Sequence, residues 1–445
     1  MSVGKPGSHC RGGDFAVFRP IRASERLPAA ASCNSLRGMT SALAYDPADP
    51  NVRRNPFPLY AQLQDDDPVH WSPALRAWVL TRYDDVRQMM LSDAMSPDRL
   101  RPFYAQLQGE RRDTLAEVMR YMSLWLVFRD PPEHTRLRRL VGTVFNLKAL
   151  EALDGAVTRV VDHLLDQLPT GRPVDWAQQV AAPLPAYVIM DMLAIPYSAF
   201  PELKEASDEL RAFIGGARAD GDRYARARSG AERLAAFFRR LIKERRAAPG
   251  EDFVSRMIAA RDDEGRLSED ELVATCMLVL FAGHETTTHL LGNAVHALLD
   301  HPEQLQRLRD DPALIDSAVE EFLRYDGPSN AIARVVKLDH VIEGRQLKAG
   351  DRVFGFANAA NRDPRMFAEP QALDLGRTPN RHLTFGFGLH FCMGAPLARL
   401  EGQRCIGRLV QRFTRIKRVA GPAGEPEWID ALAMRGVSRL PIQLG

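Results

Sequence analysis

The chain has 445 residues, of which 45% are apolar and 26% are charged, and its formal net charge is +2 at pH 7. This composition is typical of a globular protein that buries a large core, and the near-neutral charge does not indicate nucleic acid as a partner. The five cysteines form no CxxC pair and no disulfide-like framework, which favours a reducing, cytoplasmic compartment.

The N-terminal segment, residues 1–40, mixes Gly, Pro, Ser, Arg and Ala and contains no apolar core of a signal peptide. It is predicted to be a disordered extension, and Met39 is a candidate for the native start. The longest strongly apolar run, from Cys276 to Ala282, is far shorter than the roughly 20 residues that a membrane span requires. No membrane association is therefore expected.

The first third of the chain alternates helical and extended patterns. Residues 56–64 have helical spacing, residues 78–81 read as a strand, and another helix is predicted from Tyr83. Residues 92–115 are irregular and mixed in polarity, which predicts a long loop. A further helix is expected to begin at the Asp-Pro-Pro-Glu run of residues 130–133, because proline and acidic residues favour a first turn.

The middle of the chain, from about residue 147 to 300, is largely helical, with breaks near Pro196, Gly215-Gly216 and Gly265. Its clearest element begins after Ser268, which has capping-box spacing to Glu271. The pattern continues without proline to residue 301. At 1.5 Å per residue, about 33 residues make a helix of roughly 50 Å, long enough to cross a domain.

The last third of the chain combines one short helix with several strands. The helix is predicted to end at Arg324-Tyr325-Asp326, before the Gly327-Pro328 stop. Residues 335–353 alternate in polarity around a Glu343-Gly344 turn, and residues 435–444 are also strand-like. The expected fold is mainly α with a smaller β-rich part.

A single thiol, Cys392, lies in a loop with glycines on both sides, shortly before a segment that opens with Pro396. Glycine tolerates positive φ and lets the backbone pass close to a flat cofactor. A helix N-terminus after the loop is expected to lower the pKa of the thiol. One thiolate cannot close a structural zinc site, but it can be the proximal ligand of a haem iron.

The loop resembles the FxxGxxxCxG haem-loop signature of the cytochrome P450 family at four positions, namely Phe385, Gly388, Cys392 and Gly394. The resemblance runs from about Tyr45 to the C-terminus. It implies one domain over residues 41–445, with a long central helix above a haem b whose iron is ligated by Cys392. Membrane-bound members carry an N-terminal hydrophobic helix, so the chain is similar to the soluble bacterial kind.

The predicted long helix carries a run that resembles the acid–alcohol motif of the family, with Glu285 as the acid and Thr286 as the alcohol. In the family this pair orders water and delivers protons for oxygen activation, so both residues are candidate catalytic groups. A tolerated helix kink at the glycine and threonines is the competing interpretation. Phe281, Ala282 and Ile332 correspond to pocket-lining positions and suggest an apolar ligand.

Glu321 and Arg324 form an ExxR pair three residues apart, which resembles the structural ExxR of the family. By the resemblance, this pair locks the region beneath the haem. The haem propionates require cationic partners, and the matching positions hold His134, Arg138, Arg334 and His382. His390 and Arg101 are weaker candidates, and an ordinary surface cluster is the competing explanation.

The resemblance implies a monooxygenase that hydroxylates or epoxidises an apolar small molecule with O2 and two electrons. The haem domain accounts for the whole chain, so a ferredoxin and a ferredoxin reductase are expected as electron donors to a monomeric enzyme. Four arginines could form a basic patch that docks the ferredoxin, or could simply belong to a solvated surface, and the two interpretations have equal weight. They are Arg136, Arg139, Arg399 and Arg404. Two alternatives remain: a peroxide-driven enzyme, which usually lacks the acid–alcohol pair, and a haem-binding sensor, which would not need Thr286.

Overall fold

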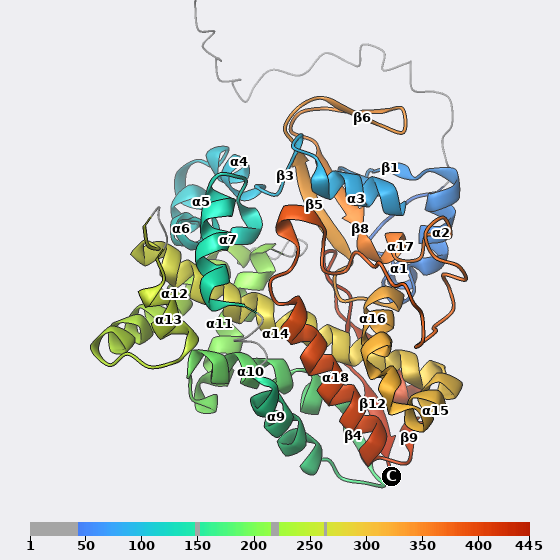
Figure 1. Cartoon of the computed structure of the whole chain (residues 1–445). Helices are drawn as coiled ribbons and strands as arrows, with labels where there is room; N and C mark the ends of the chain where they lie inside the picture. The colour runs from blue at the N-terminus through green and yellow to red at the C-terminus, as the bar shows by residue number, and fades with distance from the viewer. Residues whose placement is uncertain (1–42, 147–151, 215–221, 262–264) are drawn as a thin grey trace, which may run out of the picture. The chain divides into compact units, whose positions relative to one another are not determined.

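Helices make up most of the protein between residues 43 and 445 (Figure 1). The computed structural model describes residues 43–146, 152–214, 222–261 and 265–445. The predicted extension, Met39 and the predicted break at Gly215-Gly216 therefore lie outside the described residues. The α-helices are α1 (Pro50–Arg54), α2 (Phe57–Asp66), α3 (Tyr83–Leu91), α4 (Leu100–Ala105), α5 (Gly109–Thr114), α6 (Ala116–Met122), α7 (Glu133–Val144), α9 (Asp154–Asp166), α10 (Pro183–Leu193), α11 (Phe200–Ile214), α12 (Arg223–Ala247), α13 (Phe253–Ala259), α14 (Glu269–Asp300), α15 (Pro302–Asp310), α16 (Ile315–Tyr325), α17 (Ala357–Ala360) and α18 (Ala395–Arg412).

Short helical turns and strands complete the fold. The turns are η1 (Leu126–Phe128), η2 (Ala177–Ala181), η3 (Tyr197–Ala199), η4 (Pro312–Leu314), η5 (Gly388–His390) and η6 (Pro422–Gly424). The strands are β1 (Val69–Ser72), β2 (Ala77–Leu80), β3 (Met95–Ser96), β4 (Pro173–Asp175), β5 (Ala331–Val336), β6 (His340–Ile342), β7 (Arg345–Leu347), β8 (Arg352–Phe356), β9 (Ile416–Arg418), β10 (Glu427–Trp428), β11 (Val437–Arg439) and β12 (Pro441–Leu444).

The predicted long helix is α14, which spans 32 residues. The Ser268 hydroxyl accepts a hydrogen bond from the Glu271 backbone N–H at 3.2 Å, and the Glu271 carboxylate accepts one from the Ser268 N–H at 2.8 Å. The predicted capping box is thus confirmed. The preceding break at Gly265 is also confirmed, since α13 ends at Ala259. None of the helices in the described ranges combines the length and hydropathy that a membrane-spanning helix needs.

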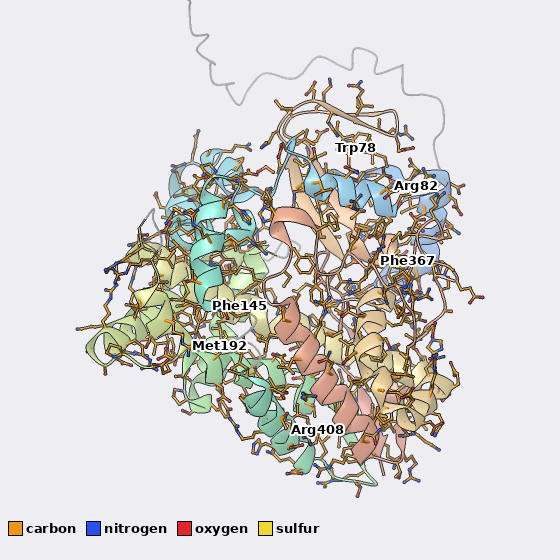
Figure 2. All side chains as sticks on the ribbon, viewed as in Figure 1. Trp78, Arg82, Phe145, Met192, Phe367 and Arg408 are labelled. Carbon is orange, nitrogen blue, oxygen red and sulfur yellow. The ribbon has the colours of Figure 1, made fainter. Side chains whose placement is uncertain are left out.

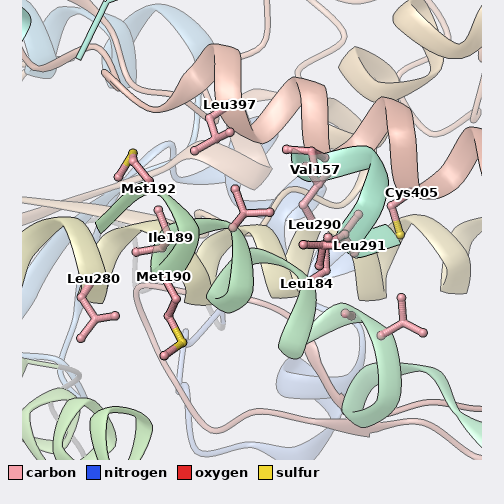
Figure 3. Close-up of a cluster of buried hydrophobic side chains, with 14 of the residues drawn as sticks. Val157, Leu184, Ile189, Met190, Met192, Leu280, Leu290, Leu291, Leu397 and Cys405 are labelled. Carbon is pink, nitrogen blue, oxygen red and sulfur yellow. The ribbon is translucent and has the colours of Figure 1, made fainter. Parts of the chain in front are cut away.

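The main core lies where α14 packs against α10 and α18, and α9 packs against both α10 and α18. Figure 3 shows Leu290 of α14, Leu184 of α10, Val157 of α9 and Cys405 of α18 in this cluster. A Cβ on Gly283 would lie 2.6 Å from the Cδ1 atom of Ile189. The close approach of α10 therefore explains why glycine occupies the middle of α14, even though it costs about 1 kcal/mol of helix propensity.

The β-rich part is built around a five-stranded sheet in the order β1-β2-β8-β5-β3. Only the pair β2 and β8 is parallel within that sheet. A second sheet has the order β4-β12-β9, and β10 pairs with β11 in a separate two-stranded sheet. The strand-like pattern at residues 435–444 is thus confirmed by β11 and β12. The predicted Glu343-Gly344 turn is confirmed between β6 and β7, and both of its residues have positive φ.

The predicted long loop at residues 92–115 is wrong. This segment contains β3, α4 and α5. Pro102 had favoured a loop, but it occupies the third position of α4, where a backbone N–H has no partner within the helix. Leu100 is buried in the main core, which shows that packing rather than local pattern stabilises this short helix.

Candidate active site

Cys392 lies in a tight turn between η5 and α18. Its backbone N–H donates a hydrogen bond to the Phe385 carbonyl at 2.9 Å, which closes the loop. Gly386 and Gly388 have φ of +75° and +70°, in the left-handed region that favours glycine. A Cβ on Gly388 would lie 2.9 Å from Leu91 of α3. The positive φ values therefore explain why glycine occupies both positions, whereas the contact at Gly388 involves only the end of the exposed Leu91 side chain.

Burial raises the pKa of the Cys392 thiol. The backbone N–H groups of Gly394 and Ala395 and the charges of Arg138 and Arg399 act in the opposite direction, as expected at the start of a helix. The net direction is opposite to the predicted lowering, because the loss of solvation outweighs these contacts. A coordinated metal ion would reverse this balance, since metal binding deprotonates a thiol.

The Cys392 thiol is a candidate for the one protein ligand of a cofactor's metal ion, rather than for one of several protein ligands in a closed metal site. Within the described ranges, no group of three or more His, Cys, Asp or Glu side chains is placed to hold a metal ion. The other described cysteines, Cys276 and Cys405, are buried in the core. Cys392 therefore fits a cofactor that supplies the remaining ligands itself, as a haem does.

A cluster of basic side chains from several elements lies beside this loop. His134 and Arg138 come from α7, Arg334 from β5 and His390 from η5, and Arg99 directly precedes α4. The rings of His134 and His390 are 4.2 Å apart between centroids. Both ring nitrogens of His134 are buried without a hydrogen-bond partner. We refer to these five residues as the basic cluster.

The charges of the basic cluster are only partly balanced by the nearby Asp130 carboxylate, which acts to raise the pKa of His134 and of Arg334 but does not outweigh their burial. Burial, together with repulsion from the other members, lowers the pKa of His390 to about 3 and the pKa of Arg334 to about 10. Burial alone lowers the pKa of Arg99 to about 10. Buried cations and unpartnered donors are costly unless an anion meets them. The basic cluster therefore fits the two carboxylates of the predicted haem.

The structure brings three of the four predicted propionate partners together and places the fourth elsewhere. The His382 Nε2 atom is 3.2 Å from a carboxylate oxygen of Glu320, and its Nδ1 atom accepts a hydrogen bond from the Thr384 N–H at 3.3 Å. His390, a weaker candidate by sequence, is in the basic cluster instead. Arg101 pairs with Asp98. The geometry thus favours His390 over His382 and Arg101.

Thr286 and Glu285 lie side by side near the middle of α14. The Thr286 hydroxyl donates a hydrogen bond to the Ala282 carbonyl at 3.1 Å. A carboxylate oxygen of Glu285 is 2.7 Å from the Nε atom of Arg211 on α11. Burial raises the pKa of Glu285 to about 7, although the charge of Arg211 opposes this shift. The pair therefore combines a hydroxyl with a carboxyl that can gain or lose a proton near neutral pH.

Glu285 is linked to a short chain of charged side chains along α11. Asp208 lies 3.3 Å from Arg211 and 2.6 Å from Lys204, and all three are partly exposed. Sequence reasoning missed Arg211, because nothing in the local pattern of α11 shows that it faces α14. These charged side chains provide a polar route between the buried Glu285 carboxyl and solvent.

The ExxR pair is fully buried. Arg324 donates two hydrogen bonds to Glu321, both at 2.8 Å, and three more to the carbonyls of Asn361, Pro370 and Ala372. Glu321 also accepts hydrogen bonds from Arg377, which the sequence did not single out. The contacts tie α16 to the segment before the Cys392 loop, in agreement with a structural role.

The three predicted pocket residues come from two elements. Phe281 and Ala282 lie about one turn before Thr286 on α14, and the Phe281 ring is 5.1 Å from the ring of Trp125. Ala282 is exposed, although it lies in the middle of a long central helix. Ile332 is on β5, two residues before Arg334, and is partly buried.

In the predicted docking patch, Arg136, Arg399 and Arg404 are ion-paired. Arg136 pairs with Glu271, Arg399 with Glu320 at 2.6 Å, and Arg404 with Asp154 at 2.5 Å. Pairing reduces the charge that these side chains offer to another protein. The arrangement favours a mainly solvated and paired surface over a strongly basic patch.

Comparisons with known proteins show which family the sequence resembles. The sequence model of the family "Cytochrome P450" matches residues 108–422. The vitamin D(3) 25-hydroxylase of Pseudonocardia autotrophica is 38% identical over 396 residues, which cover 88% of this chain and 94% of that protein. The cytochrome P450 monooxygenase PikC of Streptomyces venezuelae is 34% identical, over 87% of this chain and 91% of that protein.

The fold is also similar to that of a solved structure. The polyketide biosynthesis cytochrome P450 PksS of Bacillus subtilis superposes with a TM-score of 0.81 at 32% identity. The match covers 90% of this chain and 100% of that chain.

Proposed function

Because this chain belongs to the cytochrome P450 family, we propose that it hydroxylates or epoxidises an apolar small molecule with electrons supplied by a ferredoxin and its reductase. Membership establishes the coarser statements: the protein is a P450 monooxygenase that binds haem b and acts on a small molecule with O2. The substrate, the electron donor and the roles of individual residues are the proposal.

We propose that Cys392 would bind the haem iron as a thiolate, and that the basic cluster would bind the haem carboxylates. The bound haem supplies oxygen activation, which a thiolate ligand favours. The chain contributes orientation and charge balance. The unpartnered nitrogens of His134 and the lowered pKa values of Arg334 and His390 support this assignment, since a bound dianion would relieve both.

The single observation that carries the monooxygenase mechanism is the pair Glu285 and Thr286. A carboxyl with a pKa of about 7 can deliver a proton and be reprotonated at neutral pH. The Thr286 hydroxyl uses its hydrogen for the Ala282 carbonyl, so its oxygen can accept a hydrogen bond from an ordered water. Arg211 and Asp208 extend the route toward solvent.

The proposed substrate is apolar. Phe281, Ala282 and Ile332 offer no hydrogen-bonding side chains, and Phe103 of α4 packs near Phe213 of α11, with 6.0 Å between the ring centroids. Relatives are named for 25-hydroxylation of vitamin D(3) and for polyketide biosynthesis. An apolar molecule with few polar groups is consistent with this lining.

A ferredoxin is the proposed electron donor. The described residues near Cys392 include two large exposed apolar side chains, Leu389 at 55% and Phe391 at 39%. The neighbouring arginines Arg399 and Arg404 are ion-paired. We therefore expect docking to involve apolar contact beside the Cys392 loop as well as charge.

Reconstitution tests the proposal. We expect the haem-loaded protein, a ferredoxin, its reductase and NADPH to convert an apolar substrate to a product with one oxygen atom from isotope-labelled O2. Mass spectrometry of the product measures this incorporation. Equal product formation with peroxide alone would favour the peroxide-driven alternative. Tight ligand binding without any product would favour a sensor.

A further inference from the structure

Glu320, the residue before the ExxR glutamate, joins three separate parts of the chain. Its carboxylate accepts two hydrogen bonds from Arg399, at 2.6 and 2.9 Å, and lies 3.2 Å from the Nε2 atom of His382. Glu320 is on α16, Arg399 is in the first turns of α18, and His382 precedes the Cys392 loop. One carboxylate thus contacts both flanks of that loop.

The two neighbouring carboxylates of α16, Glu320 and Glu321, contact different segments around the Cys392 loop. Glu321 contacts residues 374, 377 and 380, which come before the loop, and its side chain is fully buried. Glu320 contacts residues 382 and 399, which bracket Cys392, and its side chain is 25% exposed. Glu321 therefore stabilises the segment that leads to the loop, whereas Glu320 contacts its two ends.

The contacts continue from Arg399 to the cysteine. The Arg399 guanidinium carbon lies 4.7 Å from the centre of the Phe385 ring, a cation–π distance. The Phe385 carbonyl accepts the hydrogen bond from the Cys392 N–H at 2.9 Å. The ring of His382 is also close to Phe385, at 5.7 Å between centroids. Both Glu320 partners therefore pack against the residue that closes the Cys392 turn.

We propose that Glu320 is a positioning residue for Cys392, which holds both ends of the loop and keeps the sulfur in place for ligation. This inference rests on the proposed role of Cys392 as the haem ligand. Glu320 itself touches neither the sulfur nor the proposed cofactor partners in the basic cluster. Its effect is transmitted through Arg399, His382 and Phe385.

The charge state of Glu320 suits this role. Burial acts to raise the pKa of Glu320, but hydrogen bonds from His382 and Arg399 outweigh it and lower the pKa to about 2. The carboxylate therefore stays ionised throughout the working pH range. A charge-assisted, bidentate pair with arginine also fixes the relative orientation of α16 and α18.

The test compares Glu320→Gln with Asp154→Asn. The first change keeps the size of the side chain but removes the charge that holds Arg399 and His382. The second removes an equivalent bidentate partner from Arg404 on the same helix, away from the loop. The measurement is the rate at which the reduced, CO-bound haem protein loses its thiolate absorption band and gains the band of a neutral thiol ligand.

We expect Glu320→Gln to speed this conversion by roughly 10-fold, since a hydrogen bond to a charged group contributes about that factor to an equilibrium or a rate. Asp154→Asn should leave the rate unchanged. The midpoint of thermal unfolding by far-UV circular dichroism should be similar in the two variants, which separates local positioning from global stability. Glu320→Asp should restore part of the effect.

Three results would overturn the inference. In the first, Glu320→Gln and Asp154→Asn convert at the wild-type rate. In the second, Glu320→Gln keeps the wild-type rate of band conversion but binds the ferredoxin more tightly. Glu320 would then serve to neutralise Arg399 at the ferredoxin-binding surface rather than to position Cys392. In the third, the wild-type protein lacks the thiolate band, and the proposed ligand role of Cys392 then fails as well. If Glu320→Gln does not fold, Arg399→Lys and His382→Gln test the same contacts separately.

Discussion

Replacing Arg324 by methionine is expected to lower the free energy of unfolding by about 3–5 kcal/mol, because it leaves the Glu321 carboxylate buried without its main counter-charge. The Arg324 side chain is fully buried, and the change also removes three hydrogen bonds to backbone carbonyls. The measurement is denaturant unfolding of the haem-loaded protein, followed by far-UV circular dichroism.

Arg408→Met provides a matched control for this prediction. Arg408, labelled in Figure 2, pairs with Asp162 at 2.8 Å, but both side chains are more than 40% exposed. An exposed pair of this kind contributes only about 0–1 kcal/mol. Equal losses of stability in the two variants would contradict the structural role of the ExxR pair.

The second large effect concerns proton delivery. Glu285→Gln is expected to lower the rate of product formation by roughly 10²–10⁴-fold, the usual contribution of a positioned acid–base group. Burial raises the pKa of Glu285 to about 7, so the carboxyl holds its proton below that pH and loses it above. Wild-type turnover should therefore fall as the pH rises through about 7, and the Glu285→Gln profile should be flat there.

The neighbouring threonines offer a control within the same helix. Thr286→Ala and Thr288→Ala each remove a hydroxyl that donates to a carbonyl four residues earlier, at 3.1 and 2.9 Å. Only Thr286→Ala is expected to consume NADPH and O2 without forming product. If both variants stay coupled, or if Glu285→Gln keeps the wild-type pH profile, the proposed proton route is wrong.

Much of the fold could be predicted because its signals are local. The capping box at Ser268, the proline-led start of α7 and the Glu343-Gly344 turn each depend on neighbouring residues, and all three are present in the structure. The Cys392 loop is similar, since its glycines meet a local requirement for positive φ. Residues 92–115 were mispredicted, because α4 and α5 are too short to show a helical period and are stabilised by packing.

The charged contacts around the site could not be predicted in the same way. Arg377 binds Glu321, which is 56 positions away in the sequence, and Arg211 pairs with Glu285. Together with burial, Arg99 lowers the pKa of Arg334, which is 235 positions away. No local period reports such a contact. Whether a histidine near the loop faces a cation cluster or a carboxylate is equally a matter of tertiary structure, which separates His390 from His382.

The central claim is that Cys392 ligates the haem iron as a thiolate, and the optical spectrum of the reduced, CO-bound protein tests it most directly. We expect the wild-type protein to show the long-wavelength band that is diagnostic of a thiolate ligand, and an apolar substrate to shift the ferric band. Cys392→Ser should lose the thiolate band, whereas Cys405→Ser, at a buried thiol on α18, should keep it. A wild-type protein without the band, or a Cys392→Ser variant that retains it, would contradict the assignment.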